Sequence, residues 1–350
     1  MSSIRPLPAH LDAVLNEFTS GLDLSDLRRS AQRTSETYRH EYGRMDQSAV
    51  VNRIDTLAYL GYRFPATYAA VRSVFAELVA RRPGFVPLSV LDVGAGPGTA
   101  TLAAWEAWSE TITGAAGDST DGQFSQLIEK SPIMIDLARN IIEGLSQRGM
   151  MPVLEPSYVC TDVTARVPLQ GADLVVAAYL LGELPTRRVA TLIGTLWRAC
   201  KEVVVLVEPG TPAGYATIQT ATLGLAGMGA HILAPVAMNW DCLASSDDWL
   251  HFSVRVPRSR LARSLKQAEL GHEDEKFSYL IASRRSGRPF AARVVRHPQI
   301  RAGHIRLRIC TENGVGDVVV PRSRRTGYAI AKRLDWGDAI SQLDLTALLP

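Results

Sequence analysis

Hydrophobic residues between positions 89 and 210 fall into short apolar runs separated by longer segments. The runs are Val90–Val93, Phe124–Ile128, Ser157–Cys160, Ala172–Ala178 and Val203–Val207. Several are apolar at consecutive positions, which is typical of strands that are covered on both faces of a parallel sheet. The intervening segments have helical length and spacing. This alternation predicts an α/β fold with a parallel sheet and helices on both of its sides.

The pattern differs on either side of this core. Residues 1–85 place apolar side chains at three- and four-residue spacing, which predicts a helical N-terminal cap. From His304 to Cys310 apolar and polar residues alternate, and Val318–Pro321 follows a glycine-rich turn. That alternation predicts a small antiparallel β subdomain. We therefore divide the chain into a cap at 1–85, an α/β domain at 86–283 and a basic C-terminal β subdomain at 284–350.

The first apolar run leads into a turn that contains three glycines. Asp92 lies within the run, and Gly94, Gly96 and Gly98 alternate with Ala95 and Pro97 before a helical segment from Thr99 to Trp108. Without a Cβ the backbone bends sharply and a ligand can touch it, while the next helix contributes amide donors. The spacing is neither G-x-G-x-x-G nor a phosphate loop. It resembles the first motif of class I S-adenosylmethionine (SAM) methyltransferases, in which Asp92 would orient the turn or the amino group of the cofactor.

Further acidic residues follow the second and third runs. Glu129 ends the second run, where nucleotide-binding α/β folds place a carboxylate on the ribose hydroxyls. Its alternative role is that of an acid at a helix N-terminus. Asp162 follows the third run; in the methyltransferase pattern an acid there reaches the adenine amino group, and a turn-forming aspartate is the alternative. Because ligands sit beyond the carboxyl ends of parallel strands, these residues should share one rim with the glycine turn.

Composition indicates a globular protein but charge is unevenly distributed. The 350 residues are 46% hydrophobic and 21% charged, with a net charge of +3. Residues 284–325 carry 11 arginines against Glu312 and Asp317, a net charge of +9, which leaves −6 for the rest. Such a basic segment suggests contact with a polyanion. We expect no secretory signal, no membrane contact and, from four cysteines without a C-x-x-C pair, a reducing cytoplasmic location.

Several longer motifs resemble the methyltransferase-like small-ribosomal-subunit assembly family of bacteria and mitochondria. They are Y-R-F-P-A-T-Y (62–68), L-D-V-G-A-G-P-G (91–98), Y-L-L-G-E-L (179–184), V-E-P-G-T-P-A-G (207–214), D-D-W-L-H-F-S-V-R-V (247–256), E-L-G-H-E-D-E-K-F-S-Y (269–279) and R-A-G-H (301–304). The resemblance covers most of the chain. It implies a class I methyltransferase fold, SAM as cofactor, and contact with ribosomal RNA while the small subunit matures.

The sequence departs from this family at the cysteines. The resemblance implies an iron–sulfur cluster on four cysteines, and the matching positions here are Val236, Cys242, Leu250 and Cys310. Valine and leucine cannot ligate iron, and such a cluster needs all four ligands unless another group substitutes. We therefore expect no metal. Apolar packing of Val236, Leu250 and two tryptophans, Trp240 and Trp249, would hold the segment instead.

The basic segment offers a candidate RNA surface. Strand alternation places Arg306 and Arg308 on one face with His304, and Arg322, Arg324 and Arg325 follow. Guanidinium groups suit phosphate because they donate hydrogen bonds in pairs. The alternative is a solvated charged face without a partner.

Catalytic residues are harder to recognise, since methyl transfer depends mainly on alignment of the acceptor. The fourth strand has no D/N-P-P-Y/F sequence, and we find no Pro-Cys nucleophile. The polar groups expected nearest the methyl group are Tyr179, Glu183 and Glu208, for which structural roles are equally open. Three functions remain: a methyltransferase for ribosomal RNA, an assembly factor that keeps the SAM pocket without transfer, and a methyltransferase for a small molecule or peptide. Arg63 and Tyr68 could contact a substrate, but we favour packing of the cap onto the core.

Overall fold

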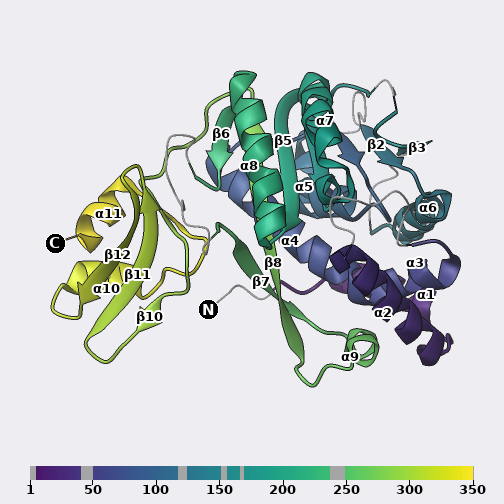
Figure 1. Ribbon diagram of the computed structural model, residues 1–350, viewed down its shortest axis with the longest axis horizontal. Coiled ribbons are helices and arrows are strands. Elements are labelled where there is room, and N and C mark those ends of the chain that lie inside the picture. Colours follow the sequence, from purple (N-terminus) through teal and green to yellow (C-terminus); the bar gives the residue numbers. More distant parts are fainter. Residues whose placement is uncertain are drawn as a thin grey trace.

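Two β-sheets organise the chain (Figure 1). The computed structural model describes residues 5–40, 50–116, 124–150, 156–165, 169–236 and 249–349. Four helices come first and form the cap, and they are α1 (Ala9–Thr19), α2 (Leu24–His40), α3 (Arg53–Tyr62) and α4 (Phe64–Arg81). Among the described residues no helix is long and apolar enough to cross a membrane.

The larger sheet follows the cap. Its strands are β1 (Ser89–Val93), β2 (Phe124–Glu129), β3 (Ser157–Cys160), β4 (Ala172–Ala178), β5 (Cys200–Pro209), β6 (His231–Ala234), β7 (Phe252–Pro257) and β8 (His272–Ser283). Their order is β3-β2-β1-β4-β5-β8-β6, and β7 pairs with β8. Strands β1 to β5 pair in parallel, whereas β8 runs antiparallel between β5 and β6. The five strands predicted from the apolar runs are confirmed.

Helices cover both faces of this sheet. They are α5 (Thr99–Ala116), α6 (Pro132–Gln147), the short 3₁₀ helix η1 (Leu181–Glu183), α7 (Thr186–Ala199) and α8 (Pro212–Gly227). Successive strand side chains point to opposite faces. Leu174 and Val176 of β4 accordingly join a core with the cap, α5 and α6, whereas Val175 and Ala177 join a second core with α7 and α8. Burial on both faces explains why these strands are apolar at consecutive positions.

One helix is longer than the sequence predicts. We expected α5 to end at Trp108 and a polar loop to follow from Ser109, but the helix continues to Ala116. Extending an existing helix fixes one residue for each hydrogen bond gained, so weak helix formers can continue a helix that they would not start. Ser109 to Ala116 includes alanine, isoleucine and glutamate, which are compatible with that extension.

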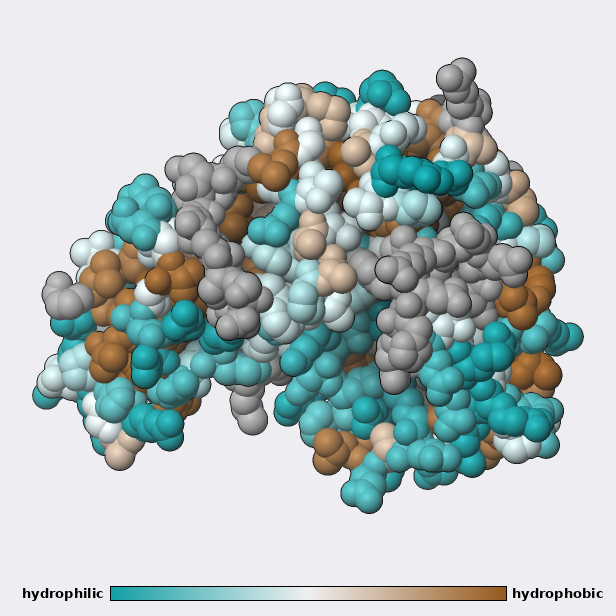
Figure 2. Space-filling view, in the orientation of Figure 1, coloured by the Kyte–Doolittle hydropathy of each residue, from teal (hydrophilic) through white to brown (hydrophobic). Residues whose placement is uncertain are grey.

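The antiparallel strand β8 is much longer than the part paired with β5. Its N-terminal half, together with β7 and the helix α9 (Arg260–Lys266), projects from the sheet as a ribbon that we call the arm. The arm reaches the cap, because α9 packs against α2 and α3. Figure 1 shows the arm extending below the large sheet next to α2. Hydrophilic side chains cover this lower face (Figure 2).

The second sheet forms a separate C-terminal lobe. Its strands are β9 (Ala292–Val294), β10 (Gln299–Ile300), β11 (His304–Thr311), β12 (Gly314–Pro321) and β13 (Ala339–Ile340), and its helices are α10 (Arg325–Ala331) and α11 (Gln342–Leu348). Ile305 and Leu307 of β11 are buried in the same core as Leu348 of α11. Arg306 and Arg308 occupy the opposite, exposed face, so the predicted alternation is confirmed. Helical cap, α/β core and small antiparallel sheet are thus all present, whereas the exact domain boundaries stay a prediction.

A fully buried arginine joins this lobe to the rest of the molecule. Arg293 on β9 is 0% exposed and donates hydrogen bonds to the carbonyl oxygens of Pro235 at 2.8 Å and Gly337 at 2.7 Å. Its third contact is the carboxylate of Glu77 on α4, at 2.6 Å. Burial alone would raise the pKa of Glu77, but Arg293 and Arg81 outweigh it and hold that pKa below its usual value. The contacts of Arg293 therefore join the cap, the large sheet and the lobe at one point.

We expect Arg293→Met to lower the free energy of unfolding by about 3 kcal/mol, because removing one partner of a buried ion pair leaves the other uncompensated. Urea unfolding followed by tryptophan fluorescence measures this loss. Arg288→Met is the control, since Arg288 is exposed in the same segment. A loss below about 1 kcal/mol for Arg293→Met would show that the contact does not stabilise the junction.

Candidate functional site

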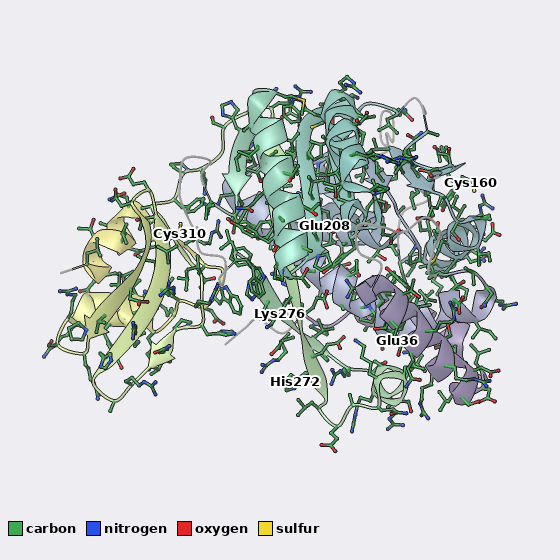
Figure 3. All side chains as sticks on the ribbon, viewed as in Figure 1. Glu36, Cys160, Glu208, His272, Lys276 and Cys310 are labelled. Atoms are coloured by element: carbon green, nitrogen blue, oxygen red, sulfur yellow. The ribbon has the colours of Figure 1, made fainter. Side chains whose placement is uncertain are left out.

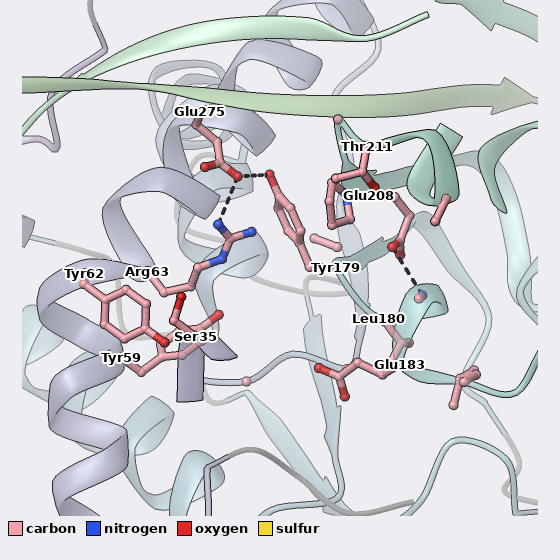
Figure 4. A pocket seen from close by; sticks show the side chains of 18 of the residues that line it. Ser35, Tyr59, Tyr62, Arg63, Tyr179, Leu180, Glu183, Glu208, Thr211 and Glu275 are labelled. Carbon is pink, nitrogen blue, oxygen red and sulfur yellow. Dashed lines mark hydrogen bonds and ion pairs between the residues drawn. The ribbon is translucent and has the colours of Figure 1, made fainter. Parts of the chain in front are cut away.

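A cavity of about 1270 Å³ opens at the carboxyl ends of the parallel strands. It brings together residues that the sequence predicted separately. Those lining it are Gly94, Gly96, Glu129, Asp162, Tyr179, Glu183 and Glu208. The remaining wall includes the first residues of α7 and α8 together with parts of α2, α3 and the arm. The strands therefore position one half of the cavity, while the cap and arm position the other (Figure 4).

The glycine turn passes three times through the left-handed backbone region. The φ angles are 71° at Gly94, 53° at Gly96 and 78° at Gly98. A Cβ at Gly98 would press on Leu127 of the core, and one at Gly94 would lie 2.7 Å from the side chain of Leu180. A Cβ at Gly96 would meet no described atom within 4 Å. Gly96 is thus the position where bare backbone faces the open cavity, which is the cradle that a bound SAM requires.

Two of the predicted cofactor residues support the turn without facing the cavity. Ala95 is buried, and its N–H donates to the carbonyl of Ile128 at 3.0 Å. Asp92 is 1% exposed and accepts hydrogen bonds from the N–H of Thr101 at 3.0 Å and from its hydroxyl at 2.9 Å. Burial raises the pKa of Asp92 to about 6 against these bonds. Of its two predicted roles, this geometry suits orientation of the turn.

Glu129 holds the glycine turn and lies at the N-terminus of α6, as its alternative role predicted, while its contact with ribose stays a prediction. One carboxylate oxygen accepts the N–H of Gly96 at 3.0 Å, and the other accepts the N–H of Ser131, the residue before α6, at 2.9 Å. Each carboxylate oxygen can accept a further hydrogen bond. Glu129 therefore fixes the glycine turn and still has acceptor capacity for hydroxyl groups. Asp162 likewise lines the cavity while its oxygen accepts the N–H of Thr164 at 2.7 Å in a turn.

Tyr179 directly follows the fourth strand, β4, and has a strained conformation. Its φ of 58° is one of two positive values among the described non-glycine residues, and such strain often marks functional sites. The hydroxyl donates to Oε1 of Glu275 at 2.8 Å, and Arg63 donates to the same oxygen at 3.0 Å while lying 4.3 Å from the centre of the ring. Burial, then the Glu275 carboxylate, raises the pKa of Tyr179 well above its ordinary value. The phenol thus stays protonated and donates.

The other two predicted catalytic residues, Glu208 and Glu183, differ in their burial and in their partners. Glu208 is 0% exposed and accepts the N–H groups of Leu181 at 2.7 Å and Gly182 at 3.2 Å, so it holds η1 in place. Glu183 lies at the end of η1 with its side chain 21% exposed and the ammonium of Lys130 at 3.8 Å. Burial raises the pKa of Glu183 to about 7, with Lys130 opposing the rise and Glu129 adding to it.

The half of this cavity that the cap and the arm build was not predicted from the sequence. The arm residue Glu275 carried no signal of its own, because its partners Arg63 and Tyr179 lie 212 and 96 residues away in the chain. We favoured a packing role for Arg63 and Tyr68. Arg63 joins the cap to Tyr179 and Glu275 and also lines the cavity, whereas Tyr68 is buried and is not among the described lining residues.

The segment that replaces the family's cysteines is packed by apolar and aromatic groups. Leu250 is 3% exposed in the main core, and Val236 packs against that core. Trp249 donates to the carbonyl of Gly210 at 2.9 Å and stacks on His251. Cys310 is buried in the C-terminal lobe, far from Cys160 at the other end of the molecule (Figure 3). Cys242 and Trp240 lie outside the described residues.

The residues at these positions do not form a four-thiolate site. Within the described part of the chain, no group of three or more histidine, cysteine or acidic side chains could hold a metal ion.

The predicted RNA-binding arginines have different surroundings. Arg306 and Arg308 are 50% and 43% exposed and share one carboxylate, Asp317, at 2.7 and 3.4 Å. Arg322 and Arg325 are exposed. Arg324 donates to the carbonyl of Leu348 at 2.8 Å and so caps α11. Of the set, Arg324 has a structural contact, and the others present charge to solvent.

This strand order, with β8 inserted antiparallel beside β5 and a glycine turn after β1, defines a class I methyltransferase fold. Residues 53–341 match a family model described as mitochondrial small ribosomal subunit Rsm22. The chain therefore belongs to the Rsm22 family, as its motifs predicted.

A human relative, ribosome assembly protein METTL17, mitochondrial, is 29% identical over 314 residues, which are 84% of this chain. The chain covers 64% of the length of that relative.

Solved structures with similar folds are more distant in sequence. Magnesium protoporphyrin IX methyltransferase (ChlM) from Synechocystis PCC 6803, with bound SAH, the demethylated product of SAM, superposes with a TM-score of 0.41 at 16% identity. The match covers 79% of this chain and 100% of that one. Precorrin-6y C5,15-methyltransferase from Geobacter metallireducens has a TM-score of 0.36 at 17% identity, covering 61% of this chain and 87% of that one.

Glu183 should make stability depend on pH. Its pKa is about 7 in the folded protein against 4.5 ordinarily, so the folded state holds the proton more tightly and loses stability as pH rises through 7. Between pH 6 and 8 we expect a loss of about 1 kcal/mol in the free energy of unfolding, which Glu183→Gln should abolish. Urea titrations at both pH values measure it. An unchanged pH dependence in Glu183→Gln, with Glu143→Gln as the exposed control, would contradict the assignment.

Proposed function

We propose that the protein binds SAM in the cavity above the large sheet and transfers its methyl group to RNA of the maturing small ribosomal subunit. The observation that carries the proposal is the open backbone at Gly96, which faces a cavity lined by the two acids expected at a nucleoside site, Glu129 and Asp162. Membership of the Rsm22 family supports the small subunit as the partner.

Each half of the cavity would serve a different ligand. The backbone at Gly96 would approach the aminoacyl end of SAM, Glu129 would accept the ribose hydroxyls and Asp162 the adenine amino group. Bound SAM supplies a methyl group already activated by the sulfonium charge, so the protein mainly has to align the acceptor. Tyr179 and Glu183 face the cavity and would position that acceptor, whereas Glu208 would act indirectly through η1.

The C-terminal lobe would bring the RNA. Arg306 and Arg308 stand on its exposed sheet face with one shared carboxylate, so this face keeps a net positive charge. Arg322 and Arg325 add charge on the same lobe. Contacts of this kind position a nucleic acid through its phosphates rather than select its sequence. The acceptor nucleotide would therefore be chosen in the cavity.

A second function is an assembly factor that binds SAM without transfer. The observation that favours it is the engagement of the acids: Asp92 and Glu208 are bound to backbone or hydroxyl groups rather than free in the cavity. The human relative is itself described as a ribosome assembly protein. A small-molecule or peptide acceptor remains the third function, to be separated from the others by the same assay.

Gly96→Asp should abolish SAM binding, because the new side chain projects into the open space of the cavity. We expect affinity to fall at least about tenfold, measured by calorimetry with SAM and SAH. Gly149→Asp is the matched control: its φ is 65°, a Cβ there also meets no described atom within 4 Å, and it does not line the cavity. Equal binding by wild type and Gly96→Asp would rule out the cofactor site.

The same variants test turnover. Labelled SAM is incubated with immature small subunits and each protein. Label on RNA that depends on Gly96 supports transfer, and SAM binding without any label supports the assembly factor. Label on a peptide or small molecule alone would support the third function.

The exposed arginines of the lobe should make the affinity for RNA depend on salt concentration. If Arg306 and Arg308 contact phosphates, replacing both by glutamine should weaken RNA binding and reduce the slope of log affinity against log salt by roughly 0.7–0.9 for each lost contact. Lys332→Gln with Arg333→Gln removes the same charge after α10 and should leave the slope closer to wild type. Filter binding to small-subunit RNA across a salt series measures it. An unchanged slope in the Arg306 and Arg308 variant would count against this surface.

The compartment would follow the ribosome that the protein serves. The cysteine pattern predicts the cytoplasm, whereas the human relative is mitochondrial. Fractionation of cells followed by detection of the protein on small subunits decides between the two.

A further inference from the structure

The cavity is larger than one cofactor needs. Pockets for a single small molecule usually measure about 300–1,000 Å³, and this cavity measures about 1270 Å³. The half built by the cap and the arm includes Tyr59, Tyr62 and Lys266, and none of these belongs to the strand ends that would hold SAM. The two halves meet at Arg63, Tyr179 and Glu275 (Figure 4). A second ligand therefore has room, and these residues border it.

The junction lies beside the glycine turn. Tyr179 follows β4, the sheet neighbour of β1, and the next residue, Leu180, touches the turn at Gly94. Glu275 belongs to the arm. Strand β8 pairs with β5 only from Phe277 onward, where Phe277 lies opposite Pro209, and Glu275 lies two residues before Phe277. A carboxylate from the arm thus meets the side chain of the residue that follows β4, Tyr179.

Only one oxygen of this carboxylate is occupied. Tyr179 and Arg63 both donate to Oε1 of Glu275, and among the described residues no hydrogen bond reaches Oε2. The side chain lines the cavity and is 15% exposed. An ionised carboxylate only accepts hydrogen bonds, so a ligand that meets Oε2 must present an N–H or O–H group.

We propose that Glu275 holds the methyl acceptor, and that the acceptor is an amino-bearing nucleobase of single-stranded or extruded RNA. This inference rests on the proposed function. A planar base suits this half of the cavity, because Tyr59, Tyr62 and Tyr179 all line it and aromatic side chains favour contact with bases. A base within a duplex could not reach the cavity without leaving the stack. Its amino group would donate to Oε2 and so be oriented toward the glycine turn.

Methyl transfer from SAM to the amino nitrogen of the base needs no further reactant. The lone pair of the amino nitrogen forms the bond to the methyl carbon, and the carbon–sulfur bond breaks with its electron pair left on sulfur. The proton lost from nitrogen passes to water. Glu275 is a positioning residue in this scheme when it orients the base, and Arg63 and Tyr179 hold its other oxygen in place.

The test compares bases in which the amino group is replaced by a carbonyl oxygen and the neighbouring ring nitrogen gains a hydrogen. Short single-stranded oligonucleotides with one central cytidine among uridines are titrated against all-uridine oligonucleotides, using protein saturated with SAH. A second pair replaces adenosine by inosine. We expect the amino-bearing base to bind at least about tenfold more tightly in one of the pairs, since hydrogen bonds to charged groups are among the stronger ones. Glu275→Gln should remove most of this preference.

Two variants separate positioning from a purely structural role. Glu273→Gln is the matched control, because Glu273 lies two residues away on the same strand face, is also 15% exposed and pairs with Arg258 and Lys266, yet is not itself among the described lining residues. Tyr179→Phe removes the hydroxyl that binds Oε1 and keeps the ring. If Glu275 only clamps Tyr179, Tyr179→Phe and Glu275→Gln should have the same effect. If Glu275 meets the base, Tyr179→Phe should reduce the preference much less than Glu275→Gln does, because Arg63 still donates to Oε1.

The outcomes are distinct. A preference lost in Glu275→Gln, kept in Glu273→Gln and reduced much less in Tyr179→Phe supports the inference. SAH binding without any amino preference in the wild type, no detectable oligonucleotide binding, or equal loss in Tyr179→Phe and Glu275→Gln overturns it. Failure of the proposed function looks different, because wild-type protein would then bind neither SAM nor SAH.

Discussion

The backbone between residues 94 and 98 must turn through left-handed conformations to connect β1 to α5, and the architecture around the cavity depends on that turn. Glu129 holds it from β2 through the N–H of Gly96, and Asp92 holds the start of α5 through Thr101. Both carboxylates accept hydrogen bonds from backbone N–H groups without any ligand. The turn is therefore preorganised, and a ligand that contacts it does not have to order it.

The part of the fold that follows from local pattern was predictable. Consecutive apolar residues in β4 and β5 reflect burial on both faces, and alternation in β11 reflects one buried and one exposed face. The rim was predictable too, because carboxyl ends of parallel strands converge. The arm was not, since β8 joins the sheet antiparallel after a long excursion. The role of Glu275 depends on that excursion, and no spacing in the chain expresses it.

Charge counted along the sequence overstated the basic surface. Of the arginines in the C-terminal segment, Arg293 is buried against Glu77, Arg324 caps α11, and Arg284 donates to the carbonyl of Trp197 at 2.6 Å. These side chains fix elements to one another rather than face a polyanion. Arg306 and Arg308 remain exposed, and they share the carboxylate of Asp317. Guanidinium groups serve both purposes because their fork can satisfy several carbonyl oxygens as readily as a phosphate.

Helix α4 connects the lobe to the cavity. Arg293 anchors the lobe to α4, and Arg63, the residue between α3 and α4, borders the cavity opposite Tyr179. Helix α4 thus contacts the lobe through Glu77 near its C-terminal end and adjoins the cavity at its N-terminal end. A helix is stiff along its axis. A displacement of the lobe would therefore move α4 and, with it, the cavity wall where Arg63 contacts Glu275. Under the proposed function, a polyanion on the lobe and a base in the cavity would therefore contact parts of the molecule that α4 joins.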